Sequence, residues 1–248
     1  MLFQKWILSL GRYMQLLGRT FRKPENFRMY YRAFMSDLEL LGLNSLGIVS
    51  VISIFVGAVV TIQTAFNLDD PLVPDYYIAI ATRESIILEF SPTIISLILA
   101  GKVGSNIAST LGSMRVSEQI DALEVMGVNP ASYLIAPKIL ALVFFNPILI
   151  MLSMFLGMIG GYLASLGGVM SVEDFAYGLT VDFNAYHVSY AIMKTFVFAF
   201  LIVSISGYFG FYVKGGAIEV GVNATKAVVS SSVAIIVSNY ILTQLLLV

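Results

Sequence analysis

Five long apolar segments alternate with shorter polar stretches along this chain of 248 residues. The segments are residues 46–66, 77–100, 133–163, 187–213 and 225–247. An α-helix needs about 20 apolar residues to cross a bilayer, so each segment is long enough to span one. The third segment contains Pro147, which should kink it because proline interrupts the hydrogen bonds of a helix. The pattern predicts an all-α membrane protein with five transmembrane helices.

The residues ahead of the first span follow a different pattern. Between residues 2 and 17, apolar side chains recur at helical spacing, namely Phe3, Trp6, Ile7, Leu10, Met14 and Leu17. A basic amphipathic helix with a tryptophan suits the headgroup layer of a membrane, and we favour this position over packing against the protein's own spans. Pro24 separates this helix from a second segment, 27–43. We divide the chain into 1–45, an interfacial helical segment, and 46–248, a five-span domain.

The basic residues indicate which loops face the cytoplasm. Residues 1–45 contain seven Lys and Arg residues, 101–138 contain three and 214–226 contain two. The other two loops, 67–76 and 164–186, contain acidic residues, including Asp69 and Asp70 in the first, and neither Lys nor Arg. Cytoplasmic loops of membrane proteins are enriched in Lys and Arg. The alternation predicts a cytoplasmic N-terminus and a C-terminus on the outer side, and it agrees with five crossings.

The composition excludes several classes of function. Charged residues make up 12% of the chain, about half of the roughly 25% found in soluble domains. The net charge of −1 gives no reason to expect a nucleic-acid partner. The chain contains no Cys and one His, His187, and its Asp and Glu residues form no ligand-spaced run. We therefore predict neither a metal site nor a catalytic Ser-His-Asp set.

The loop between the second and third spans has the features of a short amphipathic helix. Ser117 is placed to cap its N-terminus, Glu118 and Asp121 fall in its first turns, and Gly127 is placed to end it. One face of this helix is apolar and consists of Val116, Ile120 and Leu123. Such a helix can dock in a groove of another protein, or it can simply be part of a loop. The residues alone leave both interpretations open.

Ionisable residues also occur within the spans. Glu89 lies twelve residues into the second segment, about 18 Å along the helix and so near the bilayer centre. It is either a polar point in a transport pathway or a structural partner of Lys194 or Arg83. We expect Arg83 and Glu84 to snorkel toward the outer interface and Lys194 to pair with Glu84. Gly157 and Gly161 in the third span should serve helix packing within the chain.

Three stretches resemble the MlaE/YrbE permease family, the membrane subunits of phospholipid ABC transporters that work with MCE-domain proteins. Residues 101–137, which include EQIDALEVMGV, match closely, and 215–243 resemble the last cytoplasmic loop and span of the family. A third stretch, EFSP at 89–92, stands where the family usually has Arg-Glu-Leu-Gly-Pro, with Leu88 in place of the usual Arg. The resemblance covers about residues 40–248.

The resemblance implies a homodimer of five-span subunits in the bacterial inner membrane, each binding one cytoplasmic P-loop ATPase. It implies that 117–127 is a coupling helix, with Arg115, Ser117, Glu118, Asp121, Ala122 and Glu124 contributing to that contact. It also implies a lipid pocket at the dimer interface, opening toward a periplasmic MCE-domain partner. The candidate lipid-binding residues are Val60, Gln63, Phe66, Glu89, Phe90, Asn239 and Tyr240. For Gln63, capping at the membrane interface is the alternative.

The chain lacks the G-x-x-x-x-G-K-[ST] motif that cradles the phosphates of a nucleotide. If ATP drives transport, the nucleotide binds to a partner, and we expect no cofactor and no catalytic activity in this chain. The leading hypothesis is the permease subunit of an ABC transporter that moves phospholipids. The alternatives are an ion or proton channel that uses Glu89, Arg83 and Lys194, and, ranked last, a membrane-bound enzyme acting on lipids.

Overall fold

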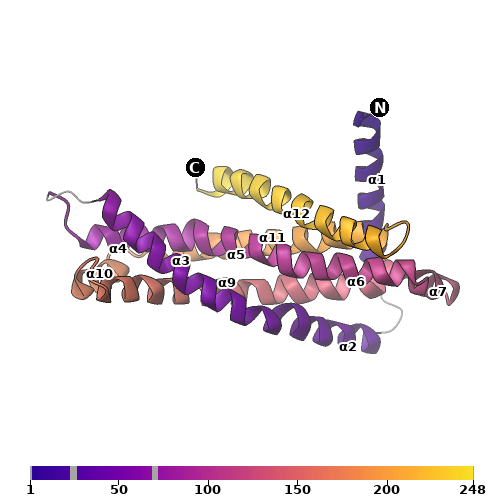
Figure 1. The fold of residues 1–248 in the computed structure, drawn as a ribbon, viewed down its shortest axis with the longest axis horizontal. Helices are drawn as coiled ribbons and strands as arrows, with labels where there is room; N and C mark the ends of the chain where they lie inside the picture. Colours follow the sequence, from indigo (N-terminus) through magenta and orange to yellow (C-terminus); the bar gives the residue numbers. More distant parts are fainter. Residues whose placement is uncertain (1, 23–26, 69–71, 248) are drawn as a thin grey trace. The chain divides into compact units, whose positions relative to one another are not determined.

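A computed structural model describes residues 2–22, 27–68 and 72–247 of the chain. Every regular element within these ranges is a helix (Figure 1). Pro24, predicted to separate two helices, and the acidic loop residues Asp69 and Asp70 lie outside the described residues.

Within these described ranges, five helical segments are long and apolar enough to cross a membrane. They are Phe27–Asn67, Tyr76–Val116, Pro130–Leu166, Ala185–Phe211 and Ala217–Leu246. These segments confirm the predicted class, an all-α membrane protein with five spans. The proposed boundary between residues 45 and 46 stays a prediction.

The first two spans are composite helices that extend beyond the predicted segments. The first consists of α2 (Phe27–Asp37), the π-helical η1 (Leu38–Gly42), the 3₁₀ turn η2 (Leu43–Ser45) and α3 (Leu46–Asn67). The second consists of α4 (Tyr76–Ser85), the π-helical η3 (Ile86–Ile94), α5 (Ile95–Leu99), the π-helical η4 (Ala100–Gly104) and α6 (Ser105–Val116). The apolar run ends near residue 100, but α6 continues because its Ile107, Ala108 and Leu111 are buried inside the protein.

The remaining helices are α1 (Leu2–Thr20), α7 (Gln119–Val125), α8 (Pro130–Leu134), α9 (Ala136–Leu166), α10 (Val172–Thr180), α11 (Ala185–Phe211) and α12 (Ala217–Leu246). They include the other predicted spans, of which the fifth begins eight residues before the predicted 225. They also include two short helices, α10 outside the predicted segments and α8 at the start of the third. Pro147 lies within α9. Three of these helices, α9, α11 and α12, contribute residues to both of the compact units into which the chain divides.

Unit 1 comprises residues 1–43, 97–145 and 197–238, and unit 2 comprises residues 44–96, 146–196 and 239–248. Their charges differ strongly. Unit 1 contains twelve Lys and Arg and seven Asp and Glu residues, a formal charge of +5. Unit 2 contains two Lys and Arg and eight Asp and Glu residues, a formal charge of −6, so that the two add to the −1 of the whole chain.

In unit 1, α1 packs through its C-terminal half and runs across the direction of α6 (Figure 1). The hydroxyl groups of Tyr13 and Ser204 lie 2.8 Å apart, and the rings of Tyr13 and Tyr208 meet edge to face at 5.9 Å. Burial raises the pKa of the Tyr13 phenol, so this group stays neutral inside the contact. The other side of α1 exposes apolar side chains, namely Ile7, Leu8, Leu10 and Met14.

In unit 2, α3 and α9 approach so closely that only glycine fits at the contact. A Cβ added to Gly57 would lie 1.9 Å from the carbonyl oxygen of Gly157, and one added to Gly160 would lie 2.0 Å from that of Ile54. A Cβ on Gly161 would lie 2.6 Å from the Thr61 hydroxyl. The predicted role of Gly157 and Gly161 in packing within the chain is confirmed.

Candidate functional site

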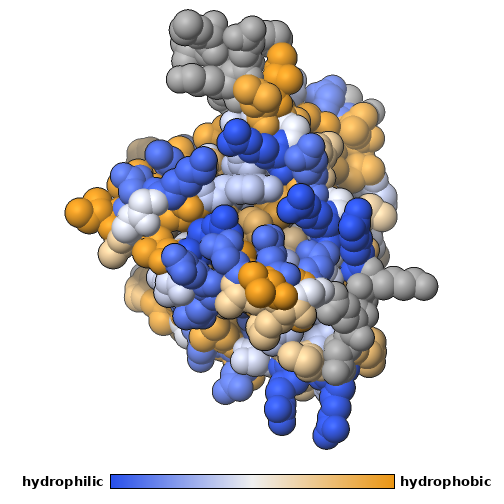
Figure 2. Space-filling model, turned by 90° about the vertical axis from the view of Figure 1, so that its right-hand side faces the viewer, coloured by the Kyte–Doolittle hydropathy of each residue, from blue (hydrophilic) through white to orange (hydrophobic). Residues whose placement is uncertain are grey.

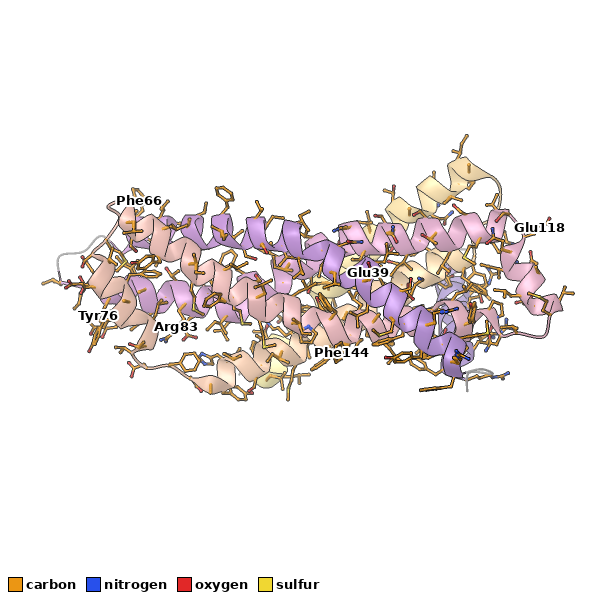
Figure 3. All side chains as sticks on the ribbon, turned by 90° about the horizontal axis from the view of Figure 1, so that it is seen from below. Glu39, Phe66, Tyr76, Arg83, Glu118 and Phe144 are labelled. Atoms are coloured by element: carbon orange, nitrogen blue, oxygen red, sulfur yellow. The ribbon has the colours of Figure 1, made fainter. Side chains whose placement is uncertain are left out.

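Arg83 is buried in unit 2, where it holds the C-terminal end of α10 (Figure 3). Its guanidinium group donates hydrogen bonds of 2.7 to 3.3 Å to the backbone oxygens of Gly178, Leu179, Val181 and Asp182. It also pairs with Glu84 at 2.8 Å, and Glu84 lies 2.5 Å from Nδ1 of His187. The prediction that Arg83 snorkels outward is wrong, because carbonyl oxygens at the helix end satisfy its donors inside the protein.

Lys194 is the second buried cation of unit 2, and its side chain is 0% exposed. Its Nζ lies 2.9 Å from Oε2 of Glu89 and donates a hydrogen bond of 3.1 Å to the carbonyl oxygen of Leu88. Pro92, four residues after Leu88, has no amide hydrogen to donate to that oxygen. The prediction that Lys194 pairs with Glu84 is wrong. The alternative, that Glu89 is a structural partner of Lys194, is confirmed.

Glu89 is the exposed member of this second cluster, because 48% of its side chain is accessible. Its Oε1 accepts hydrogen bonds from the side-chain amide of Asn239 and, at 3.3 Å, from the hydroxyl of Thr93. The sequence had placed both Glu89 and Asn239 among the lipid-binding candidates, but it gave no sign that they are in contact. Arg83 and Lys194 have different partners and form two separate clusters. The contacts among the described residues therefore do not connect Glu89, Arg83 and Lys194 into the single path that an ion or proton channel would use.

A small cleft in unit 2 is lined in part by Phe90 and Ser91, the residues that follow Glu89. The hydroxyl of Ser53 donates to that of Ser153 at 2.8 Å, which donates to that of Ser91 at 3.1 Å, along one wall. The cavity volume of this cleft is about 10 Å³, room for roughly one water molecule. The cleft within one copy of the chain is therefore too small for a lipid.

The other lipid-binding candidates differ in exposure. Phe66, at the end of α3 (Figure 3), is 83% exposed. Tyr240 is 70% exposed, and Gln63 is also exposed. Val60 is only 6% exposed and packs inside unit 2, so it does not share the surface of Gln63 and Phe66. The lipid-binding role of the set stays a prediction. No three His, Asp or Glu side chains gather as a metal site would need within residues 2–22, 27–68 and 72–247.

The predicted coupling segment forms a short helix, α7, at one end of unit 1. Ile120 is fully buried and anchors it, whereas Val125 and the following Met126 are 88% and 67% exposed. Arg115 of α6 pairs with Asp121 of α7 at 2.5 Å. Figure 2 views this end of the molecule and shows hydrophilic side chains gathered across it.

The start of α7 differs from the prediction. Ser117 does not cap this helix, because it ends α6 and its hydroxyl donates to the carbonyl oxygen of Ser113 at 2.8 Å. Glu118 follows in the left-handed conformation, with φ of 59°, at the turn between the two helices (Figure 3). The helix begins at Gln119 instead of residue 117. A left-handed glutamate is uncommon, so the residue pattern could not reveal this turn.

These features define a class of protein: a multi-pass, all-helical membrane protein with two fully buried cations in unit 2 and a short exposed helix at one end of unit 1. A family model described as Permease MlaE matches residues 34–245. The chain therefore belongs to the MlaE permease family.

Several proteins with similar sequences have names that describe a transporter or a lipid. A probable ABC transporter permease protein of Rickettsia typhi is 35% identical over 223 residues, covering 88% of this chain and 84% of that protein. One of Synechocystis is 33% identical over 253 residues, covering 97% and 92%. Protein TRIGALACTOSYLDIACYLGLYCEROL 1, chloroplastic, of Arabidopsis thaliana is 32% identical over 231 residues, covering 88% of this chain and 62% of that protein.

Proposed function

We propose that this chain is the membrane subunit of an ABC transporter that moves phospholipids between the bacterial inner membrane and a periplasmic MCE-domain partner. The observation that carries the proposal is the match of residues 34–245 to the permease family. Relatives named as ABC transporter permeases support the transporter class, and the diacylglycerol glycolipid in the name of the Arabidopsis relative supports a lipid substrate. ATP is hydrolysed by a separate P-loop ATPase, because the chain has no phosphate-binding loop of its own.

The ATPase docks on α7. This helix suits the role because the buried Ile120 and the ion pair between Arg115 and Asp121 fix it to unit 1. Its outward side presents the apolar Val125 and the acidic Glu124, which are both exposed. A rigid, exposed helix of this kind can transmit a movement of the ATPase to the spans that flank it.

The lipid pathway lies on faces that a second copy of the chain completes. In the most apolar 18-residue stretch of each span, 33% of the residues are buried in the first span and 28% in the fifth. The share is 50 to 56% in the other three spans. Within unit 2, the first span exposes Phe55, Val59 and Phe66, and the fifth exposes Tyr240. Such apolar faces suit acyl chains. The polar group that a headgroup can contact there is the Glu89 cluster, which consists of Glu89, Thr93, Lys194 and Asn239.

The topology follows from the charges. The N-terminus and the loops rich in Lys and Arg lie in the cytoplasm, and the acidic loops and the C-terminus lie in the periplasm. The exposed apolar side of α1, with Ile7, Leu10 and Met14, inserts into the cytoplasmic headgroup layer.

Co-purification of the full chain from its native membranes tests this function. Wild-type protein should bring down a P-loop ATPase, and the double variant Glu118→Lys/Glu124→Lys should lower its amount by about tenfold or more, because both exposed charges are reversed. Asp121 is left unchanged, since its loss would also break the pair with Arg115. The matched control, Glu173→Lys on α10 of unit 2, should retain the ATPase. Purification without any P-loop ATPase would contradict the proposal.

A further inference from the structure

The Glu89 cluster presents its negative end to a ligand. Lys194 supplies the positive charge, but its side chain is 0% exposed, whereas that of Glu89 is 48% exposed. The Nζ of Lys194 is engaged with Glu89, with the carbonyl oxygen of Leu88 and, at 4.4 Å, with the ring of Tyr190. The ion pair is formally neutral, yet a molecule that approaches it meets the carboxylate first and experiences a negative potential.

Unit 2 offers no surface cation to offset this carboxylate. Its Lys and Arg residues are Arg83 and Lys194 alone, and their side chains are 1% and 0% exposed. The same unit contains eight Asp and Glu residues. Among its described residues, therefore, no Lys or Arg side chain is available to bind the phosphate of a lipid.

Asn239 adds an acceptor that has no donor. Its Nδ2 donates to Oε1 of Glu89, which leaves its Oδ1 buried and without a hydrogen-bond partner among the described residues. Buried acceptors without a donor are unfavourable, so most of them find one. The accessible carboxylate of Glu89 and the unpaired Oδ1 of Asn239 are both acceptors, so a group that donates hydrogen bonds suits both. A protonated amine supplies positive charge and N–H donors together.

From this arrangement we infer that the Glu89 cluster selects lipids whose headgroup carries a protonated amine over lipids whose headgroup carries only negative charge. The ammonium group lies against the carboxylate of Glu89 and Oδ1 of Asn239, and the phosphate of the same headgroup points away from the cluster. The inference rests on the proposed function, because it names the class of lipid that such a transporter accepts.

A binding assay with three lipids tests the selection. The purified full chain, in complex with its ATPase, is incubated with equal amounts of phosphatidylethanolamine, phosphatidylcholine and phosphatidylglycerol, and the bound lipid is quantified by mass spectrometry. Phosphatidylethanolamine should exceed phosphatidylglycerol by about tenfold, the effect of one charge-assisted contact. Phosphatidylcholine should fall between them, because its quaternary ammonium is positive but has no N–H donor.

Variants connect the preference to this cluster. Glu89→Gln should reduce the ratio of phosphatidylethanolamine to phosphatidylglycerol to about one, since it removes the exposed charge. Glu173→Gln removes one exposed charge from α10 of the same unit and should keep the wild-type ratio. If Glu89→Gln does not fold, the double variant Glu89→Gln/Lys194→Met removes both charges and should give the same loss of preference.

The outcomes separate the inference from the proposed function. Wild-type complex that binds the two lipids equally, or prefers phosphatidylglycerol, overturns the inference while it still supports a lipid transporter. Retention of the preference in the variants of Glu89 overturns it as well. Equal binding of phosphatidylcholine and phosphatidylethanolamine overturns the role given to Asn239. A complex that binds none of the three lipids contradicts the proposed function itself.

Discussion

The two units of the chain place their cationic side chains differently. In unit 2, Arg83 and Lys194 are enclosed by backbone carbonyl oxygens and carboxylates and are 1% and 0% exposed. In unit 1, most described cations are exposed, as Arg12 and Lys214 are, and the paired Arg115 is 34% exposed. The difference indicates that both cations of unit 2 hold helices together inside the protein. In unit 1, Lys138 does the same through its pair with the buried Asp37, while most of the other cations face water, headgroups and partners.

The largest effect is expected at Arg83. Replacing it by Met leaves Glu84 without its cation and removes the donors that serve four backbone oxygens at the end of α10. Removal of one partner of a buried ion pair typically costs about 3–5 kcal/mol. The thermal unfolding temperature in detergent should fall strongly, and Arg83→Lys should recover only part of it because lysine has fewer donors. An unchanged unfolding temperature would show that the buried cluster contributes nothing to stability.

A smaller effect is expected at Lys194, because its partner Glu89 is half exposed and also accepts hydrogen bonds from Asn239 and Thr93. Lys194→Met should lower the free energy of unfolding by about 1–3 kcal/mol. The double variant Lys194→Met/Glu89→Gln should be more stable than the single one, since the carboxylate no longer lacks a cation. A double-mutant cycle measures this coupling, and strict additivity of the two substitutions would contradict the pairing.

The smallest effect is expected at Arg115 in unit 1. Its pair with Asp121 is 34% and 48% exposed on the two sides, and exposed pairs contribute about 0–1 kcal/mol. Arg115→Gln should hardly alter the unfolding temperature, although it loosens α7 and should weaken ATPase co-purification. A loss of stability as large as that of Arg83→Met would remove the contrast between the two units.

The residue pattern predicted the spans better than their ends. Each apolar run had to become a membrane helix, since a helix satisfies its own backbone inside a bilayer and these runs are too long and too uniformly apolar for the strands of a barrel. The helices end elsewhere because burial continues past the apolar run, as Ile107 and Leu111 of α6 demonstrate. The turn at Glu118 was missed because its positive φ comes from the packing of α6 and α7, and nothing in a glutamate signals it.

The sequence by itself determined the number of spans, the family and the identity of the ionisable residues in the membrane, since hydropathy and motif spacing are local properties. Only the tertiary structure decided the pairing of those residues. Glu89 and Lys194 are 105 positions apart, and Glu89 and Asn239 are 150 apart. Glu84 was an equally reasonable partner for Lys194 until the helices were packed. Which carboxylate meets which cation depends on the rotation and depth of each helix, and these are set by contacts such as Gly57 against Gly157.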